Sequence, residues 1–152
     1  MKKLYFLYAA GLVALASCSS NTQKSAEATD ATATEETTEA VYKGVLPAAD
    51  CEGIEYTVNL VYAPESTTDG TFDMTQVYMS DTDPATFNTK GNFTVKTGTP
   101  QSADQKYLVL ASESAPSDTT YFVVKNDSTI TFVTYELTPS TVVGLNYDLT
   151  KK

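Results

Sequence analysis

The chain has 152 residues, of which 10 are basic and 19 are acidic, so its formal net charge is −9. Every basic residue is a lysine, and the sequence contains no His, Arg or Trp. These absences exclude Ser-His-Asp and Cys-His catalysis, imidazole metal sites and bidentate arginine clamps for phosphate. Nucleic acid is not expected as a partner, because this acidity would repel a phosphate backbone. The composition therefore predicts a protein that is not an enzyme.

The N-terminus has the pattern of a secretory signal. Two lysines precede an apolar run over 4–16, which is shorter than the ~20 residues that a membrane-spanning helix needs. Residues 15–18 read Leu-Ala-Ser-Cys and resemble the bacterial lipobox. The resemblance implies a signal peptide over 1–17 and a diacylglycerol group on the sulfur of Cys18. The alternative is an ordinary signal peptide that happens to end near a cysteine.

Residues 18–40 are expected to form a lipid-anchored tether. The two residues directly after Cys18 are serines, with no aspartate there. By the sorting rule of many bacterial lipoproteins, this implies that the protein is anchored in the outer membrane, on either its periplasmic or its outer face. The segment 19–40 is acidic and has no aromatic or large aliphatic residue, so it is expected to be disordered. As a flexible coil it would reach about 25 Å. The membrane is therefore an expected partner, bound through the lipid.

From Val41 onward, apolar and polar residues alternate, which is typical of half-buried strands. The pattern is clearest over 54–62 and returns over 143–149. Clusters of turn-forming residues separate further runs that are rich in Thr, Tyr, Phe and Val. We therefore expect strands at 41–46, 54–62, 71–79, 86–95, 106–111, 119–125, 128–135 and 143–149.

Such short, evenly spaced strands predict an all-β domain over 41–152. We expect an antiparallel, lipocalin-like barrel of about eight strands, because closure removes the exposed edges of an open sheet. The side chains expected to point inward are bulky and would fill a small lumen. They include Ile54, Tyr56, Leu60, Phe72 and Phe93.

Residues 42–54, YKGVLPAADCEGI, resemble the opening motif of the NlpE family, Tyr-x-Gly-x-Leu-Pro-Cys-Ala-Asp-Cys-x-Gly-Ile. Weaker likenesses lie in 87–93 and 145–149, so the resemblance extends over 41–150, the N-terminal domain of that family. It implies an eight-stranded barrel on an outer-membrane lipid anchor. It also implies a role in copper resistance, or in sensing envelope stress through contact with a signalling protein.

The chain departs from the family motif at the first cysteine of Cys-x-x-Cys, where Ala48 stands. Two thiols can chelate Cu(I) or form a disulfide, whereas Cys51 alone can do neither. We therefore expect Cys51 to be a packed remnant of the motif and expect no resident cofactor. The alternative is that Cys51 is one soft ligand of a copper ion. Its helpers would then be among Asp50, Glu52, Met74 and Met79.

No catalytic residues are assigned. Asp81-Thr82-Asp83 lacks the spacing of a calcium hand and is interpreted as a solvated turn. Two roles compete with the sensor that the family resemblance implies. One is a carrier of a small apolar ligand inside the barrel, which a cavity of several hundred cubic ångströms would favour. The other is a structural surface lipoprotein with no link to copper.

Overall fold

The computed structural model describes residues 37–80, 82–115 and 117–152. The predicted signal peptide, the lipidation residue Cys18 and most of the predicted tether lie outside the described residues. No helix among the described residues is long and apolar enough to cross a membrane.

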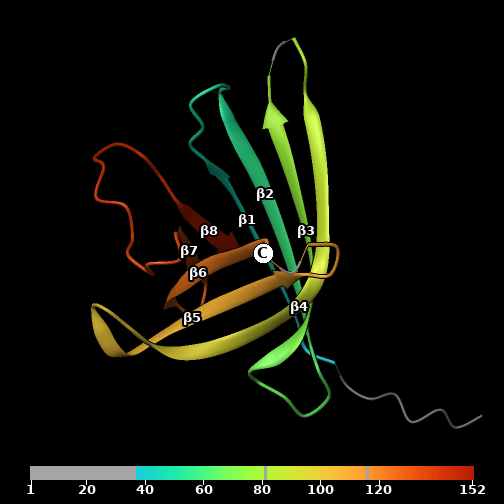
Figure 1. Cartoon of the computed structure of the whole chain (residues 1–152), viewed down its shortest axis with the longest axis vertical. Helices are drawn as coiled ribbons and strands as arrows, with labels where there is room; N and C mark the ends of the chain where they lie inside the picture. Colours follow the sequence, from blue (N-terminus) through green and yellow to red (C-terminus); the bar gives the residue numbers. More distant parts are fainter. Residues whose placement is uncertain (1–36, 81, 116) are drawn as a thin grey trace, which may run out of the picture. The chain divides into compact units, whose positions relative to one another are not determined.

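The described part is all-β, as predicted from the alternating pattern. Eight antiparallel strands follow one another in chain order and close into a barrel, because β8 pairs with β1 (Figure 1). The strands are β1 (Glu39–Leu46), β2 (Gly53–Tyr62), β3 (Asp69–Met79), β4 (Ala85–Thr99), β5 (Ser102–Ser112), β6 (Thr119–Asn126), β7 (Thr129–Val133) and β8 (Asp148–Lys151).

Alternate side chains of each strand point into the barrel and form its core. In β2 these are the even-numbered residues, and Val58 and Leu60 are fully buried. Aromatic rings fill much of the remaining space, as in the edge-to-face contact of Tyr62 with Phe93 at 5.0 Å. Four of the five residues predicted to point inward are buried, and the fifth, Ile54, packs partly buried against the same core.

The barrel closes along a short seam between β1 and β8. Only two residue pairs join these strands, Tyr42 with Lys151 and Lys43 with Thr150. The backbone N–H of Lys152 adds a hydrogen bond of 2.9 Å to the carbonyl oxygen of Val41. At the other end of β1, Val45 and Leu46 pair with β2 alone among the described strands.

The strands β1–β4 extend beyond β5–β8 at one end of the barrel. Residues 85–90 of β4 pair with β3, but the β4–β5 ladder begins only at Gly91, which lies opposite Ser112. Gly91 permits this meeting of strands, because a Cβ atom there would overlap the carbonyl oxygen of Ala111 and crowd the ring of Phe72. The inner face of β1–β4 is consequently unopposed at this end, which we call the mouth of the barrel.

The last predicted strand, 143–149, is misplaced. β8 begins at Asp148, and Val143 is 98% exposed in the loop that precedes it. Gly144 has a φ of 87°, which a strand does not adopt. The alternation of Val143, Leu145 and Tyr147 therefore reflects no strand, and from the predicted set only Leu149 enters the core as part of β8.

Other boundaries differ in length only. β1 begins two residues before Val41, and Ala40 is buried in the core, so the barrel starts inside the segment predicted as tether. β4 and β5 extend beyond the predicted ranges 86–95 and 106–111, because their ends form a polar hairpin without apolar alternation.

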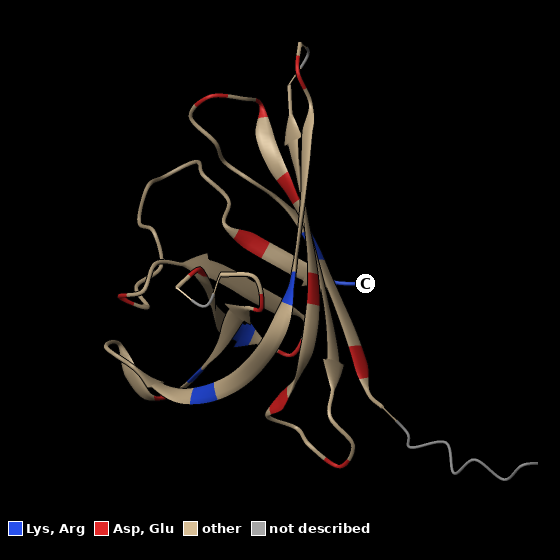
Figure 2. Ribbon diagram, turned by 45° about the vertical axis from the view of Figure 1, so that its right-hand side comes forward, with Lys and Arg blue, Asp and Glu red and all other residues tan. Residues whose placement is uncertain are grey.

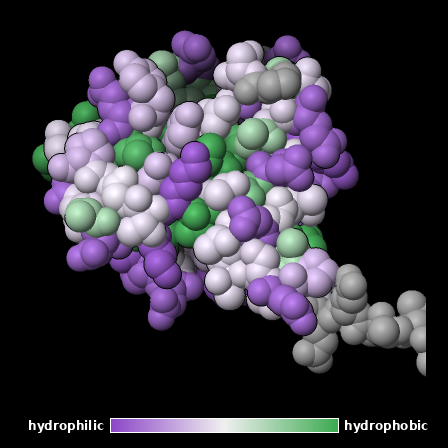
Figure 3. Space-filling view, turned by 60° about the horizontal axis from the view of Figure 1, so that its bottom comes forward, coloured by the Kyte–Doolittle hydropathy of each residue, from purple (hydrophilic) through white to green (hydrophobic). Residues whose placement is uncertain are grey.

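Seen from the side shown in Figure 3, apolar side chains are scattered among polar ones.

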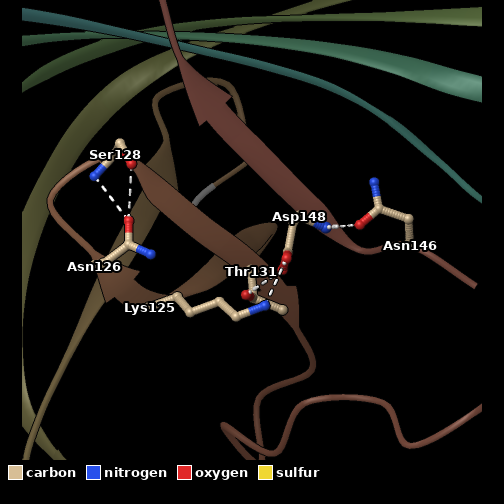
Figure 4. A network of polar contacts seen from close by, with 6 residues as sticks. All are labelled: Lys125, Asn126, Ser128, Thr131, Asn146 and Asp148. Atoms are coloured by element: carbon tan, nitrogen blue, oxygen red, sulfur yellow. Dashed lines mark hydrogen bonds and ion pairs between the residues drawn. The ribbon is translucent and has the colours of Figure 1, made fainter.

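A polar network attaches β8 to its neighbours on the outside of the barrel (Figure 4). The carboxylate of Asp148 accepts hydrogen bonds from Lys125 at 2.8 Å and from Thr131 at 2.6 Å. Partial burial raises the pKa of Asp148, but these two hydrogen bonds and the lysine charge outweigh burial, so the pKa lies below its ordinary value. The network therefore favours the folded state while Asp148 is ionised.

We predict that Asp148→Asn lowers the free energy of unfolding by about 1 kcal/mol at pH 7, because the amide carries no charge to pair with Lys125. The wild-type contribution is complete above the unfolded-state pKa of 3.8 and is lost as the pH falls through the lower folded-state pKa. Urea unfolding at pH 7 and pH 3 measures both quantities. A difference from wild type that is equally large at pH 3 contradicts the charge-based account. Asp104→Asn, on an exposed position of β5, is the matched control.

Candidate functional site

A pocket of about 570 Å³ lies at the mouth of the barrel. It is bounded by the loop that joins β1 to β2, residues 47–52, and by the end of the β3–β4 hairpin. Its lining, which defines the mouth pocket, consists of Ala48, Ala49, Asp50, Cys51, Ile54, Tyr78, Ser80, Asp83, Ala85 and Phe87.

Strand register explains why apolar side chains line this pocket. Ile54, Tyr78 and Ala85 are directly paired across β2, β3 and β4, so their side chains lie on one face of the sheet. That face is the inner face, because Ile54 shares the even-numbered side of β2 with buried Val58. The row of residues that fills the core deeper in the barrel therefore continues into the mouth, where no strand opposes it.

Two aromatic residues form the exposed wall of the mouth pocket. The rings of Tyr78 and Phe87 meet edge to face, with their centroids 5.4 Å apart. Tyr78 is 36% exposed and Phe87 is 54% exposed. Large aromatic side chains that are exposed together on a concave surface are unusual outside binding sites, because their burial by a ligand is favourable.

The filled core lies next to this pocket. Tyr56 belongs to the next inner row, paired with Gln76, whose amide nitrogen donates a 2.7 Å hydrogen bond to the tyrosine hydroxyl. Burial raises the pKa of Tyr56, although the hydrogen bond from Gln76 acts in the opposite direction. Tyr56 is only 7% exposed and contacts Phe132 across the lumen. A ligand would therefore bind at the mouth of the barrel and not in its centre.

The mouth is acidic. Asp50 and Asp83 line the pocket from two different connections, and Glu52 and Glu55 lie nearby in sequence. No lysine occurs between Lys43 and Lys90, and Figure 2 shows acidic colouring alone at the end that carries the β3–β4 hairpin. The carboxylates therefore set the sign of the electrostatic potential at this pocket.

Cys51 lies in the loop between β1 and β2, as predicted, and is half-buried in the lining of the mouth pocket. Its thiol donates a hydrogen bond of 3.2 Å to the carbonyl oxygen of Gly53. The neighbouring N–H of Glu52 donates to the carbonyl oxygen of Met79 at 3.1 Å, which attaches the loop to the end of β3. The thiol thus has a local partner in the packed loop.

The structure places the predicted helpers of Cys51 at different distances along the barrel. Met79 lies opposite Gly53, but Met74 is buried in the core opposite Val58, about 16 Å further along β3 at the usual rise of a strand. No group of three or more Cys, Asp or Glu residues that could hold a metal ion occurs in the ranges that the structure describes. With Ala48 in place of a second thiol, the described residues offer no pair of thiols that could chelate a copper ion.

Sequence reasoning identified the loop with Asp50 and Cys51 but missed the opposite wall of the pocket. Tyr78 appeared only as a member of a predicted strand, and Phe87 only as a member of a predicted strand and of the family likeness over 87–93. Their meeting depends on the register of β3 with β4. Asp83 belonged to the turn interpreted as solvated, and Asp81 lies outside the described residues. The available signal was that Phe72, Met74 and Tyr78 share one face of the predicted strand 71–79, up to the turn that follows it.

Comparison with known families supports the resemblance found in the motif. The family model of the NlpE N-terminal domain matches residues 42–141, from β1 into the loop before β8. No match was found among curated proteins or solved structures.

The geometry of Cys51 predicts that the chain and its Cys51→Ser variant take up Cu(I) equally and weakly, because a single thiol gives no chelate. Competition with a chromophoric Cu(I) chelator measures the affinity of each. Tight, stoichiometric binding that Cys51→Ser abolishes would show that a second donor completes a site with Cys51. Met79→Leu tests whether that donor is the sulfur of Met79.

Proposed function

Because the chain belongs to the NlpE N-terminal domain family, a family of cell-envelope lipoproteins, we propose that it is a non-enzymatic sensor of envelope stress, anchored in the outer membrane through lipid on Cys18. It acts by contact of its barrel mouth with a partner protein of the envelope. Copper resistance is the other role that the family resemblance implies, and Cys51, the one described cysteine, offers no pair of thiols to chelate copper.

The direction of β1 is the observation that carries this proposal. The chain coming from Cys18 enters the barrel at Glu39, and β1 then leads to Leu46 at the mouth. Eight residues of strand span about 26 Å. The mouth loop 47–52, which holds Cys51 of the family motif, and the exposed aromatic wall therefore lie at the end of the barrel farthest from the point where the tether joins. An anchored domain of this design presents its mouth to partners in the envelope.

The anchor is tested by changing Cys18. We predict that Cys18→Ser abolishes labelling of the chain with radioactive palmitate, removes the chain from the membrane fraction and eliminates its effect on an envelope-stress reporter. Cys51→Ser is the matched control, since it removes the other cysteine and leaves the lipobox intact. If the unlipidated chain restores the reporter response in full, the tethered sensor is wrong.

A second candidate function is favoured by the size of the mouth pocket. Its volume of about 570 Å³ lies within the range of small-molecule sites, roughly 300–1,000 Å³. A carrier of a small apolar ligand would use this pocket, with the ligand held at the mouth above a filled core. The alternative is a structural lipoprotein that binds no ligand. Failure of every tested ligand to bind would support this alternative.

The carrier function predicts binding of the neutral fluorophore N-phenyl-1-naphthylamine. We expect Phe87→Ala to weaken this binding about tenfold, because the ring supplies much of the exposed apolar wall. Fluorescence titration of wild type and variant gives the two dissociation constants. Tyr135→Ala is the matched control, because Tyr135 is 77% exposed and is not part of the mouth pocket. Equal weakening in both variants contradicts binding at the mouth.

A further inference from the structure

We propose that the mouth pocket selects lipophilic cations: molecules with an apolar body and a positive charge. This rests on the second candidate function and specifies the ligand class of the same pocket. Neither the family match nor the fold requires a charge preference, and the preference follows from three features of the lining.

The first feature is an apolar surface contributed by small side chains. Ala48, Ala49 and Ala85 leave the pocket wide, while Ile54 extends the apolar inner face of β2 into it. Because no strand pairs with residues 85–89 of β4 on their outer edge among the described residues, the pocket is open to a bulky ligand. Burial of apolar surface contributes about 25 cal/mol per Å², which favours a ligand with a large apolar body.

The second feature is the aromatic wall of Tyr78 and Phe87. Their edge-to-face contact turns the two rings at 73° to each other, so the wall offers both ring faces and ring edges. The faces of aromatic rings carry partial negative charge and attract cations, with ~0.5–2 kcal/mol per contact. An anion is not stabilised in the same position. The wall thus accepts any apolar body and favours positive charge where the ligand lies over a ring face.

The third feature is a pair of carboxylates that line the pocket from two different connections. Asp50 comes from the loop after β1, and Asp83 comes from the β3–β4 hairpin. Neither takes part in an ion pair among the described residues, whose two salt bridges lie at Asp73 and Asp148. With no lysine in the lining, the two carboxylates have no neutralising cation beside them among the described residues. A bound cation would supply the missing charge, whereas an anion would be repelled by both carboxylates.

Tetraphenylphosphonium and tetraphenylborate test this inference, because they have almost the same size and shape and carry opposite charges. Both are titrated by calorimetry into the chain from residue 18 onward with Cys18→Ser, in buffer without detergent. We expect the phosphonium to bind at one site and at least tenfold more tightly than the borate. Asp50→Asn combined with Asp83→Asn should weaken binding of the phosphonium at least tenfold and reduce the difference in affinity between the two ions. Phe87→Ala should weaken both ions.

The matched control for the charge change is Asp104→Asn, an exposed carboxylate on β5 outside the mouth pocket. Equal affinity for the two ions, or an equal effect of Asp104→Asn, overturns the cation preference. Titration with the neutral naphthylamine shows whether only the cation preference is wrong or the carrier function is wrong as well. If the naphthylamine binds in a Phe87-dependent way and the two ions do not differ, the carrier function stands without charge selection. If neither the naphthylamine nor the ions bind, both the carrier function and the cation preference are wrong.

Discussion

The inner face of β2, β3 and β4 is one continuous apolar surface, and the rest of the structure depends on what opposes it. Where β5–β8 lie across the barrel, this face is covered, and Leu60 and Phe72 are buried in a filled core. Where β5–β8 end, the same face continues through Ile54 and Tyr78 without a cover. The core and the pocket therefore arise from the same alternating pattern. The lengths of β5–β8 determine which part of the apolar face is covered and which part is left open.

The way in which the barrel closes determines where the covered part of this face ends and the open part begins. The β1–β8 seam consists of two residue pairs, and the Asp148 network then holds β8 against β6 and β7. On the other side, Gly91 marks the place where β5 reaches β4. Both limits leave the ends of β1 and β4 near the mouth paired on one side only. The acidic loop after β1 and the β3–β4 hairpin border the resulting opening and give the pocket its charge.

Much of the fold could be predicted from the sequence, because the alternation that defines a strand is local. The core positions of β2 and β3 follow from it directly, and the all-β barrel follows from the number of such segments. The prediction failed at 143–149, where an alternating run lies in a loop. Val143 and Leu145 fit the pattern, but Gly144 turns the chain, and no partner strand receives these side chains. An alternation of apolar and polar residues shows their order along the chain, but it does not show that the segment pairs with another strand.

The pocket could not be predicted in the same way, because it depends on differences between strands that are distant in sequence. The motif located the loop with Cys51, and Ala48 in place of the first cysteine predicts a departure from thiol chemistry. It gave no information on Tyr78 and Phe87, which meet through the β3–β4 register. Nor could it show that β4 extends beyond its partner β5. These are properties of pairing, which a single sequence does not contain.

Amide hydrogen exchange in β4 tests most directly that the mouth is unopposed. The carbonyl oxygen of Lys90 accepts a hydrogen bond from Glu113, on the side of β5. Because alternate residues of a strand direct their N–H groups to the same side, those of Thr86 and Asn88 point to the open edge. We expect these two amides to exchange rapidly, while Thr94, which pairs with Val109 in β5, is protected. Equal protection of Thr86, Asn88 and Thr94 would mean that another segment covers the edge and would contradict an open mouth.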